Sequence, residues 1–187
     1  MVIVSNHLPL RCKKSDVAFC GFEFEWDEDA LVAQAKEGIE SESVQVVYVG
    51  SLSVEVEMKD QEAVSEDLWQ RFGCLPVFLG RALKDKYYQR FCKQQLWPMM
   101  HYLLPLSPYS QARFDPELWQ SYIKANKLFS DRLIEVVNVE EDWVWVHDYH
   151  LMVLPALLRK RFHKVKVGHF LHSPFPSSEI FRTFPKR

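Results

Sequence analysis

Glycine is scarce in this sequence, with six glycines among 187 residues. Glycine-rich loops that wrap backbone amides around a phosphate, of the GxGxxG and Walker kinds, need several closely spaced glycines, and neither pattern occurs. The Gly-x-Ser-x-Gly turn that presents a serine nucleophile is absent as well. The sequence therefore encodes neither phosphate binding at a glycine-rich helix start nor the usual serine hydrolase arrangement.

Cysteine, basic charge and long apolar runs are also limited. The four cysteines lack CxxC spacing and a secretory context, which predicts reduced thiols and no bound metal; they are Cys12, Cys20, Cys74 and Cys92. A formal net charge of −2 argues against a nucleic-acid surface. No stretch reaches the roughly 18 apolar residues of a spanning helix, and no signal-peptide pattern opens the chain. We therefore expect a cytoplasmic protein with no membrane contact.

Strand and helix signals alternate along the chain. Short β-branched or aromatic runs predict strands at 2–4, 43–49, 74–79, 143–146 and 165–171. Helical periodicity and capping residues predict helices at 27–38, 61–72, 116–136 and 151–162, with a charged amphipathic segment at 81–95. Short buried strands that alternate with helices are typical of an α/β fold with a Rossmann-like parallel sheet.

Polar residues gather where these strands end. The residues concerned are Asn6, His7, Gly50, Ser51, His147, Asp148, His150, His172 and Ser173. Ligands of open α/β sheets bind beyond the carboxyl ends of the strands, so these residues predict one composite pocket. A single histidine at such a place is more often an ordinary loop residue than a catalytic one, but the coincidence of four strand ends favours a site.

The chemistry of this pocket stays open at this level. His147, Asp148 and His150 are possible zinc or iron ligands, although they straddle a strand-to-helix turn and lack a further paired carboxylate. A hydroxyl-rich ligand is the other possibility. Asp148 would accept hydrogen bonds from sugar hydroxyls, His172 would donate, and aromatic rings would pack against sugar faces or else belong to the core; these rings are Tyr87, Tyr88 and Trp97.

Four motifs, spread over the whole chain, resemble a known family. They are Val4-Ser-Asn-His-Leu-Pro9, Leu96-Trp-Pro-Met-Met-His-Tyr102, Val144-Trp-Val-His-Asp-Tyr-His-Leu151 and Gly168-His-Phe-Leu-His-Ser-Pro-Phe-Pro-Ser-Ser-Glu-Ile180. Their order and spacing are similar to those of the trehalose-6-phosphate synthases, glycosyltransferase family 20. The chain looks most like the plant class II branch, in which a synthase-like region precedes a phosphatase-like region.

The resemblance implies a GT-B fold, in which two Rossmann-like domains enclose the active site. It also implies glucose transfer from UDP-glucose to glucose 6-phosphate, with retention of configuration and without a metal or other cofactor. By motif matching, Tyr88, Trp97 and Asp148 would line the acceptor pocket together with His7. His172 would contact the donor glucose.

Several positions depart from the family pattern. His7 stands where catalytically competent members carry an arginine that clamps phosphate. Gly21 alone stands in the segment where the family has a donor-binding glycine pair, and acidic residues follow it. Tyr48 takes the place of a tryptophan, which is a milder change.

The family's synthase region is well over twice as long as this chain. We therefore expect residues 1–187 to be an incomplete N-terminal, acceptor-side Rossmann-like domain without the UDP-binding domain. Two hypotheses follow: a trehalose-6-phosphate synthase-like glycosyltransferase that is inactive as this piece alone, or a catalytically silent protein that senses a sugar phosphate. A metal-dependent hydrolase centred on His147, Asp148 and His150 is a third.

Overall fold

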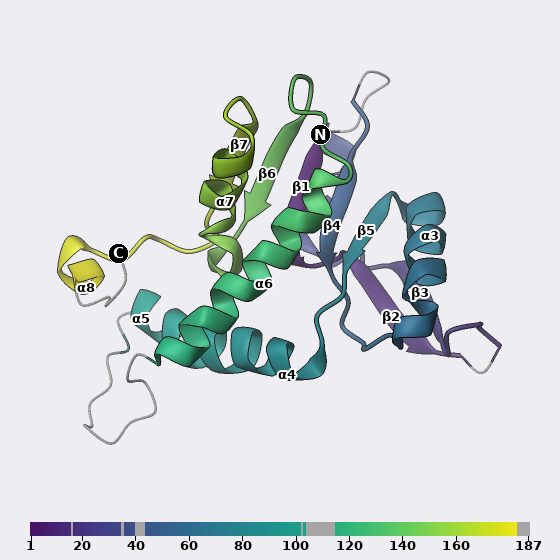
Figure 1. Cartoon of the computed structure of the whole chain (residues 1–187), viewed down its shortest axis with the longest axis horizontal. Helices are drawn as coiled ribbons and strands as arrows, with labels where there is room; N and C mark the ends of the chain where they lie inside the picture. The colour runs from purple at the N-terminus through teal and green to yellow at the C-terminus, as the bar shows by residue number, and fades with distance from the viewer. Residues whose placement is uncertain (16, 35, 40–43, 102, 104–114, 183–187) are drawn as a thin grey trace.

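A parallel sheet forms the centre of the computed structural model (Figure 1), which describes residues 1–187 except 16, 35, 40–43, 102, 104–114 and 183–187. Within the described residues the sheet has five strands in the order β5-β4-β1-β6-β7. The strands are β1 (Val2–His7), β4 (Val47–Ser51), β5 (Cys74–Val77), β6 (Trp143–His147) and β7 (Lys166–Phe170). The expected α/β fold with a Rossmann-like parallel sheet is confirmed.

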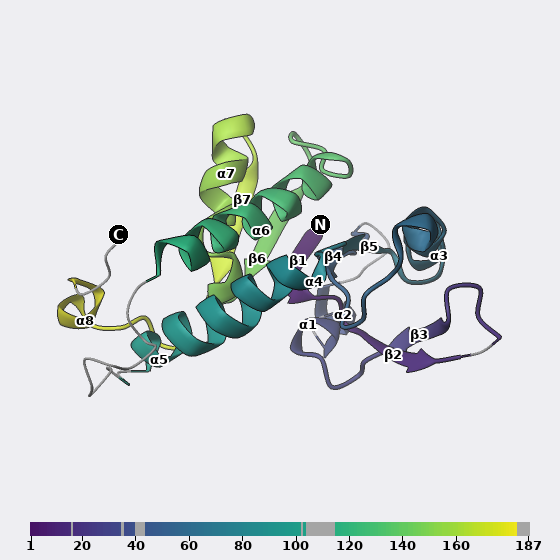
Figure 2. The ribbon, with the colours of Figure 1, turned by 60° about the horizontal axis from the view of Figure 1, so that its bottom comes forward.

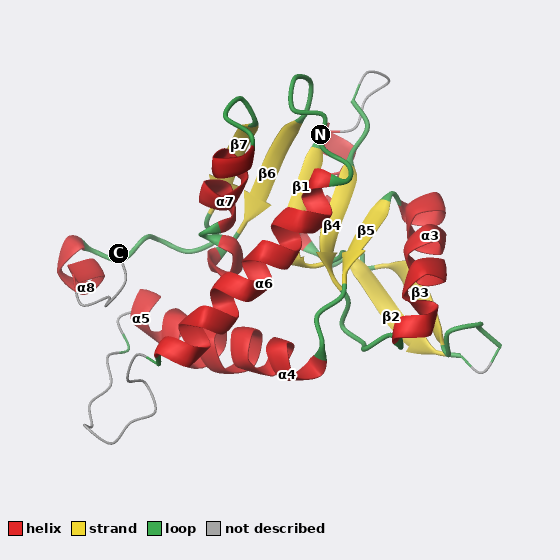
Figure 3. Ribbon diagram, in the orientation of Figure 1, coloured by secondary structure: helices red, strands yellow, loops and turns green. Residues whose placement is uncertain are grey.

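Helices and a hairpin surround this sheet (Figure 3). The helices are α1 (Leu31–Gln34), α2 (Lys36–Ile39), η1 (Met58–Asp60), α3 (Gln61–Phe72), α4 (Arg81–Lys84), η2 (Asp85–Leu96), α5 (Trp97–Met100), α6 (Pro116–Ile134), η3 (Tyr149–Leu151), α7 (Leu154–Arg161) and α8 (Ser178–Arg182). The hairpin pairs β2 (Leu10–Lys14) with β3 (Phe22–Trp26). No helix in the described ranges is long and apolar enough to cross a membrane.

The inner strands of the sheet are buried on both faces, whereas the edge strand β7 is largely exposed. Val2 and Val4 of β1 belong to a core that α6, α7 and η2 cover, whereas Ile3 belongs to a second core beneath α3 and the hairpin. Successive side chains of a strand point to opposite faces, so a run of apolar residues in β1 serves both cores. A strand that is buried on both faces continues only as far as its apolar residues do. The polar residues therefore lie where the strands end.

The segment 81–95 is wound in an unusual way. After α4 the chain continues through η2, a π-helix of 12 residues, into α5. Its buried side chains lie on one side of the helix, at Tyr87, Phe91, Cys92, Gln95 and Leu96. The sequence predicted an amphipathic segment here but not this winding.

Two expectations for the first half of the chain are wrong in detail. The helix expected at 27–38 begins only at Leu31: residues 31–34 (α1) and 36–39 (α2) are helical, and residue 35 lies outside the described residues. Residues 27–30 instead form a turn, in which the Asp27 carboxylate accepts a hydrogen bond from Arg11 Nε at 2.9 Å. The strand expected at 43–49 begins at Val47 and ends at Ser51; position 43 lies outside the described residues. The β2-β3 hairpin was not predicted.

Candidate functional site

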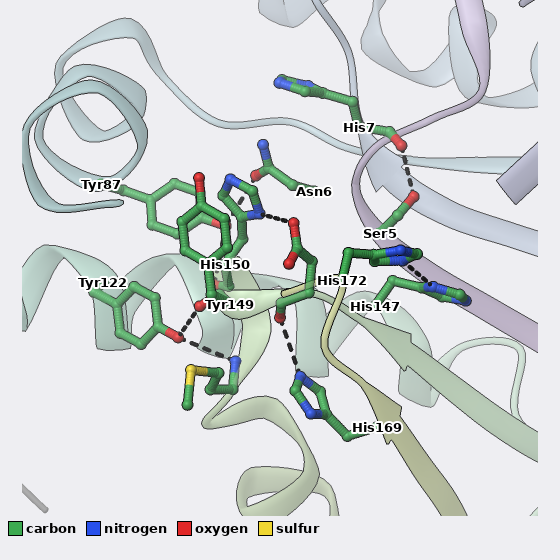
Figure 4. A network of polar contacts seen from close by, with 12 residues as sticks. Ser5, Asn6, His7, Tyr87, Tyr122, His147, Tyr149, His150, His169 and His172 are labelled. Carbon is green, nitrogen blue, oxygen red and sulfur yellow. Dashed lines mark hydrogen bonds and ion pairs between the residues drawn. The ribbon is translucent and has the colours of Figure 1, made fainter. Parts of the chain in front are cut away.

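The carboxyl ends of β1, β6 and β7 meet at one edge of the sheet, as Figure 4 shows from close by. β1 ends with Asn6 and His7, and β6 ends with His147, directly before Asp148. The α4–η2–α5 helix passes this edge and packs against η3 and α6. The expected gathering of polar residues at the strand ends is therefore present.

Asp148 has a strained backbone. Its φ of 71° and ψ of 171° lie in a region that glycine favours, and it is the one non-glycine residue with positive φ in the described part of the chain. Such a conformation costs roughly 1–3 kcal/mol and persists only where its surroundings impose it. The Asp148 N–H donates to Phe170 O at 2.7 Å, and His169 Nε2 donates to Asp148 O at 3.1 Å.

Buried hydroxyl and amide groups brace the turn that follows. Tyr122 OH donates to Tyr149 O at 2.8 Å and accepts from the Met152 N–H at 3.0 Å. The His150 carbonyl accepts from Asn126 Nδ2 at 3.2 Å, and the Tyr87 hydroxyl, whose proton goes to Asn6 Oδ1 at 2.9 Å, lies 3.2 Å from the same carbonyl. The turn with its strained Asp148 is therefore held from the helices behind it.

The carboxylate of Asp148 faces His150. Asp148 Oδ2 lies 3.4 Å from His150 Nδ1, and both side chains are mostly buried. Burial alone would raise the pKa of Asp148, but hydrogen bonds from His150 and from the Tyr149 backbone, with the nearby His150 and His172, together lower it below its usual value. Asp148 is therefore an ionised hydrogen-bond acceptor at neutral pH.

His147 and His172 form a second pair. His147 Nδ1 and His172 Nε2 are hydrogen-bonded at 2.9 Å, and their rings stack with centroids 5.2 Å apart. Burial, followed by the proximity of His172, lowers the pKa of His147 from 6.5 to about 4. Both rings cannot readily carry charge together, so at pH 7 His147 is neutral.

His7 is held in one tautomer. Ser51 Oγ donates its single proton to Asn6 O at 2.6 Å, so toward His7 Nδ1, 3.1 Å away, it can only accept. Nδ1 therefore carries the proton, and Nε2 presents a lone pair. Burial, then the positive charge of Lys84, lowers the pKa of His7 from 6.5 to about 4. At pH 7 this ring is neutral.

Unpartnered polar atoms concentrate at this edge. Buried side-chain atoms without a hydrogen-bond partner among the described residues include Asn6 Nδ2, His147 Nε2, Asp148 Oδ1, His150 Nε2 and Ser173 Oγ. Such atoms are costly unless a further group satisfies them. These atoms include both donors and acceptors and lie at the ends of three strands. A hydroxyl-rich ligand could satisfy both kinds, because each hydroxyl can donate and accept a hydrogen bond.

The aromatic residues divide between core and site. Tyr87, for which the sequence left sugar packing and core packing open, is fully buried in the core and donates to Asn6 Oδ1 at 2.9 Å. Tyr88 stacks on His150 at 5.5 Å and meets the edge of His7 at 5.2 Å, which brings it into the site. Trp97 is 40% exposed and packs 5.3 Å from Tyr149.

Gly21 is not brought together with these residues. It lies in the turn of the β2-β3 hairpin, with φ 75°, where its N–H bonds Ala18 O and its carbonyl accepts from the Ser15 N–H. The hairpin projects beyond the β4-β5 side of the sheet in Figures 1 and 2, away from β6 and β7. A predicted donor contact at Gly21 is therefore far from the polar edge in this structure.

A metal centre has little support from the geometry. In the described ranges no group of three His, Cys, Asp or Glu side chains converges as metal ligands would. His147 and Asp148 instead turn to different partners, His172 and His150.

A pocket also lies elsewhere in the fold. A surface depression of about 690 Å³ separates α3 from α6 beside β5 and contains none of the strand-end residues. Sequence reasoning missed Tyr122 and Asn126, whose bracing role depends on tertiary packing; their positions on the buried face of α6 were the only signal.

Comparisons with known proteins agree with this fold. The family described as Glycosyltransferase family 20 matches residues 1–187. Alpha,alpha-trehalose-phosphate synthase (UDP-forming) 6 of Arabidopsis thaliana is 51% identical, over all of this chain and 23% of that protein. Alpha,alpha-trehalose-phosphate synthase (UDP-forming) A of Dictyostelium discoideum is 37% identical, over all of this chain and 24% of that protein. The chain thus spans under a quarter of the length of these relatives.

Solved structures share the fold over the same residues. The N-terminal domain of Candida albicans trehalose-6-phosphate phosphatase superposes with a TM-score of 0.74 at 25% identity, covering 99% of this chain and 36% of that one. A trehalose-6-phosphate protein from E. coli, bound with UDP-2-fluoro glucose, gives 0.69 at 27% identity, covering 98% and 35%. With a family match along its whole length and about half its residues identical to a plant relative, this chain belongs to glycosyltransferase family 20.

Proposed function

We propose that the strand-end residues form the acceptor side of a trehalose-6-phosphate synthase-like site, which binds glucose 6-phosphate and faces UDP-glucose across a cleft. In this proposal residues 1–187 supply part of the N-terminal domain of a GT-B glycosyltransferase, and a second domain binds UDP. The relatives named above are synthases, and one solved neighbour holds a UDP-glucose analogue. Both findings support this substrate pair.

The unpartnered polar atoms beside Asp148 carry the proposal. An ionised carboxylate with a free oxygen, Asp148 Oδ1, can accept two sugar hydroxyls, while its other oxygen lies 3.4 Å from His150 Nδ1. The half-exposed ring of Trp97 offers an apolar face for the sugar, and the Tyr88 ring, stacked on His150, borders the site. Strain at Asp148, imposed by buried braces, is typical of positions kept for function.

His172 supports the donor side of the proposal. It lies just after β7, exposed and hydrogen-bonded to His147, so one ring position can reach a second sugar. The chemistry asked of these residues is positioning: hydrogen bonds that fix the two sugars so that the acceptor hydroxyl meets the anomeric carbon. Neutralisation of the departing diphosphate would come from basic residues of the second domain.

Calorimetric titration with glucose 6-phosphate tests this function. We expect saturable binding to the chain, weakened about tenfold or more by Asp148→Asn, which keeps the size of the side chain but removes its charge. Asp142→Asn is the matched control, because Asp142 lies before β6 and contacts Asn138 and Met1. Equal affinity in Asp148→Asn would refute the role of Asp148, and no binding at all would refute the acceptor site.

A catalytically silent, sugar-phosphate-sensing protein is the second candidate. The neutral His7, with its Nε2 lone pair, favours it because it replaces the permanent charge expected of an active synthase. UDP-glucose titration of a polypeptide extended to the length of its relatives separates the two candidates. Donor binding supports the synthase, whereas acceptor binding without donor binding supports the sensor.

A further inference from the structure

Three side chains on the α4–η2–α5 helix form a row beside His7. Lys93 Nζ lies 4.8 Å from the centre of the Tyr88 ring, in a cation–π contact, and the Tyr88 ring meets His7 edge-on at 5.2 Å. Lys84, at the start of the row, donates to Leu52 O at 2.7 Å and to Ser53 O at 3.2 Å, just past the end of β4. Two ammonium groups therefore flank the neutral imidazole.

The π winding of η2 creates this row. Lys84 and Lys93 are nine positions apart, which is half a turn out of phase in an α-helix of about 3.6 residues per turn. In a π-helix, with about 4.4 residues per turn, nine positions make about two full turns, and Tyr88 falls between them on the same side. Ordinary α-helical winding would turn Lys93 away from His7.

The two lysines differ in how many ammonium N–H donors are free to bind a ligand. Lys84 is half-buried, and its ammonium group donates hydrogen bonds to two backbone carbonyls. It therefore acts as a positive charge that is held in place. Lys93 is exposed and pairs with no carboxylate in the described part of the chain. Its ammonium group contacts the face of the Tyr88 ring. Its three N–H donors are thus available to a ligand at the edge of the site.

His7 cannot serve as the anion contact in its resting form. A phosphate oxygen approaching His7 Nε2 would meet a lone pair, because Nδ1 holds the proton against Ser51. A sugar hydroxyl, by contrast, can donate to that lone pair. An anionic group bound at this end of the site therefore needs a cation from another element.

We propose that Lys93, carried over the Tyr88 ring by the π-helical winding and backed by Lys84, is the phosphate-recognising residue of this site and determines its preference for phosphorylated over plain sugar. The inference deepens the proposed function and rests on it for the identity of the sugar. The recognised chemistry is a phosphate dianion, whether free or as a sugar ester.

The test titrates the chain with glucose 6-phosphate, glucose and inorganic phosphate, and repeats each titration for variants of the helix. Lys93→Met removes the charge but keeps the alkyl stem, and Lys93→Arg keeps both the charge and the stacking. Lys86→Met is the matched control, because Lys86 lies on the same helix but forms an ion pair with Glu117 of α6. Circular dichroism of each variant verifies that the helix is retained.

We expect Lys93→Met to weaken the binding of glucose 6-phosphate about tenfold or more and to leave the affinity for glucose unchanged. Lys93→Arg and Lys86→Met should bind glucose 6-phosphate with near the parent affinity. Glucose 6-phosphate binding that Lys93→Met leaves intact overturns the inference while the proposed function stands. Inorganic phosphate that binds in a Lys93-dependent way without any sugar binding supports the inference and overturns the proposed function. Binding of none of the three probes overturns both.

Discussion

His147 Nδ1 and His172 Nε2 lie 2.9 Å apart, so that one hydrogen bond joins the end of β6 to the loop after β7. The two rings come from separate βα units and meet only because β6 and β7 are neighbours in the sheet. This pair and the Asp148–His150 pair occupy the same sheet edge (Figure 4). The polar edge of the molecule is therefore a network of coupled histidines around one carboxylate.

The first prediction concerns acid. His147 and His7 have folded-state pKa values lowered from 6.5 to about 4, so the unfolded chain binds protons that the folded chain does not between these values. Stability is retained above pH 6.5 and falls as the pH drops toward 4. We expect His147→Gln to reduce this loss by about 2 kcal/mol, measured by urea unfolding at pH 7 and 4.5.

The exposed His163 supplies the control for this prediction, because His163→Gln should keep the parent's pH dependence. A His147→Gln variant with the full acid loss would show that His147 is not held neutral in the fold.

The second prediction concerns backbone strain. Asp148→Gly and Asp148→Ala both delete the carboxylate, but only glycine adopts φ 71°, ψ 171° without a steric cost. We expect the glycine variant to be more stable than the alanine variant by about 1 kcal/mol or more in denaturant unfolding. Equal stability of the two would mean that the chain relaxes at this turn. Neither variant should bind glucose 6-phosphate.

The third prediction concerns the close approach of β4 to the end of β1. A Cβ on Gly50 would lie 2.6 Å from Leu8 N and 2.8 Å from His7 C, both backbone atoms. Gly50→Ala should therefore displace His7 and destabilise the chain by more than about 2 kcal/mol. Gly168→Ala, whose nearest contact would be the Trp145 side chain at 4.0 Å, is the comparison and should change stability little. Similar melting of both variants would contradict this packing.

The fourth prediction concerns the brace behind the site. Tyr122→Phe removes the hydroxyl that links Tyr149 O with the Met152 N–H, which should cost about 1–3 kcal/mol. Tyr149→Phe is the comparison, because no hydrogen bond of the Tyr149 hydroxyl exists among the described residues, and its cost should be smaller. The measurement compares the free energies of unfolding of the two variants. If Tyr149→Phe is less stable than Tyr122→Phe, Tyr122 is not the brace.

The fifth prediction concerns turnover. The family resemblance implies that UDP is bound by basic residues outside the matched part of the relatives. This chain covers 23% of the Arabidopsis relative. We expect no release of UDP from a mixture of UDP-glucose and glucose 6-phosphate by the 187-residue polypeptide. A complete synthase assayed in parallel controls the assay, and measurable UDP release would overturn this division of labour.

Sequence patterns predicted the elements whose signals are local. The helix from Pro116 follows from an Asp115 cap, which accepts from the Glu117 N–H at 2.8 Å, and from apolar residues at helical spacing. The β2-β3 hairpin was missed although its pairing is local, because the resemblance suggested an altered donor-binding loop in the segment around Gly21. The π winding of η2 depends on how Tyr87 and Phe91 pack against α6, which no local signal encodes.

The site was predictable in its place but not in its construction. Parallel strands carry their carboxyl ends to one edge, so the positions of His147, Asp148 and His172 followed from the order of strands and helices. The low pKa that keeps His7 neutral depends first on its burial and then on the positive charge of Lys84, which comes from another element. The strain at Asp148 is likewise invisible in the sequence, since it is imposed by tertiary contacts.

Imidazole NMR during a glucose 6-phosphate titration tests most directly whether the strand-end cluster is a sugar-phosphate site. The chain has seven histidines, and the exposed His163 lies outside the cluster, whereas His101 packs on Trp97 with ring centroids 3.7 Å apart. We predict saturable shifts at His150 and His172, with His163 unmoved. Absence of any shift, or equal shifts at all seven rings, would contradict the site.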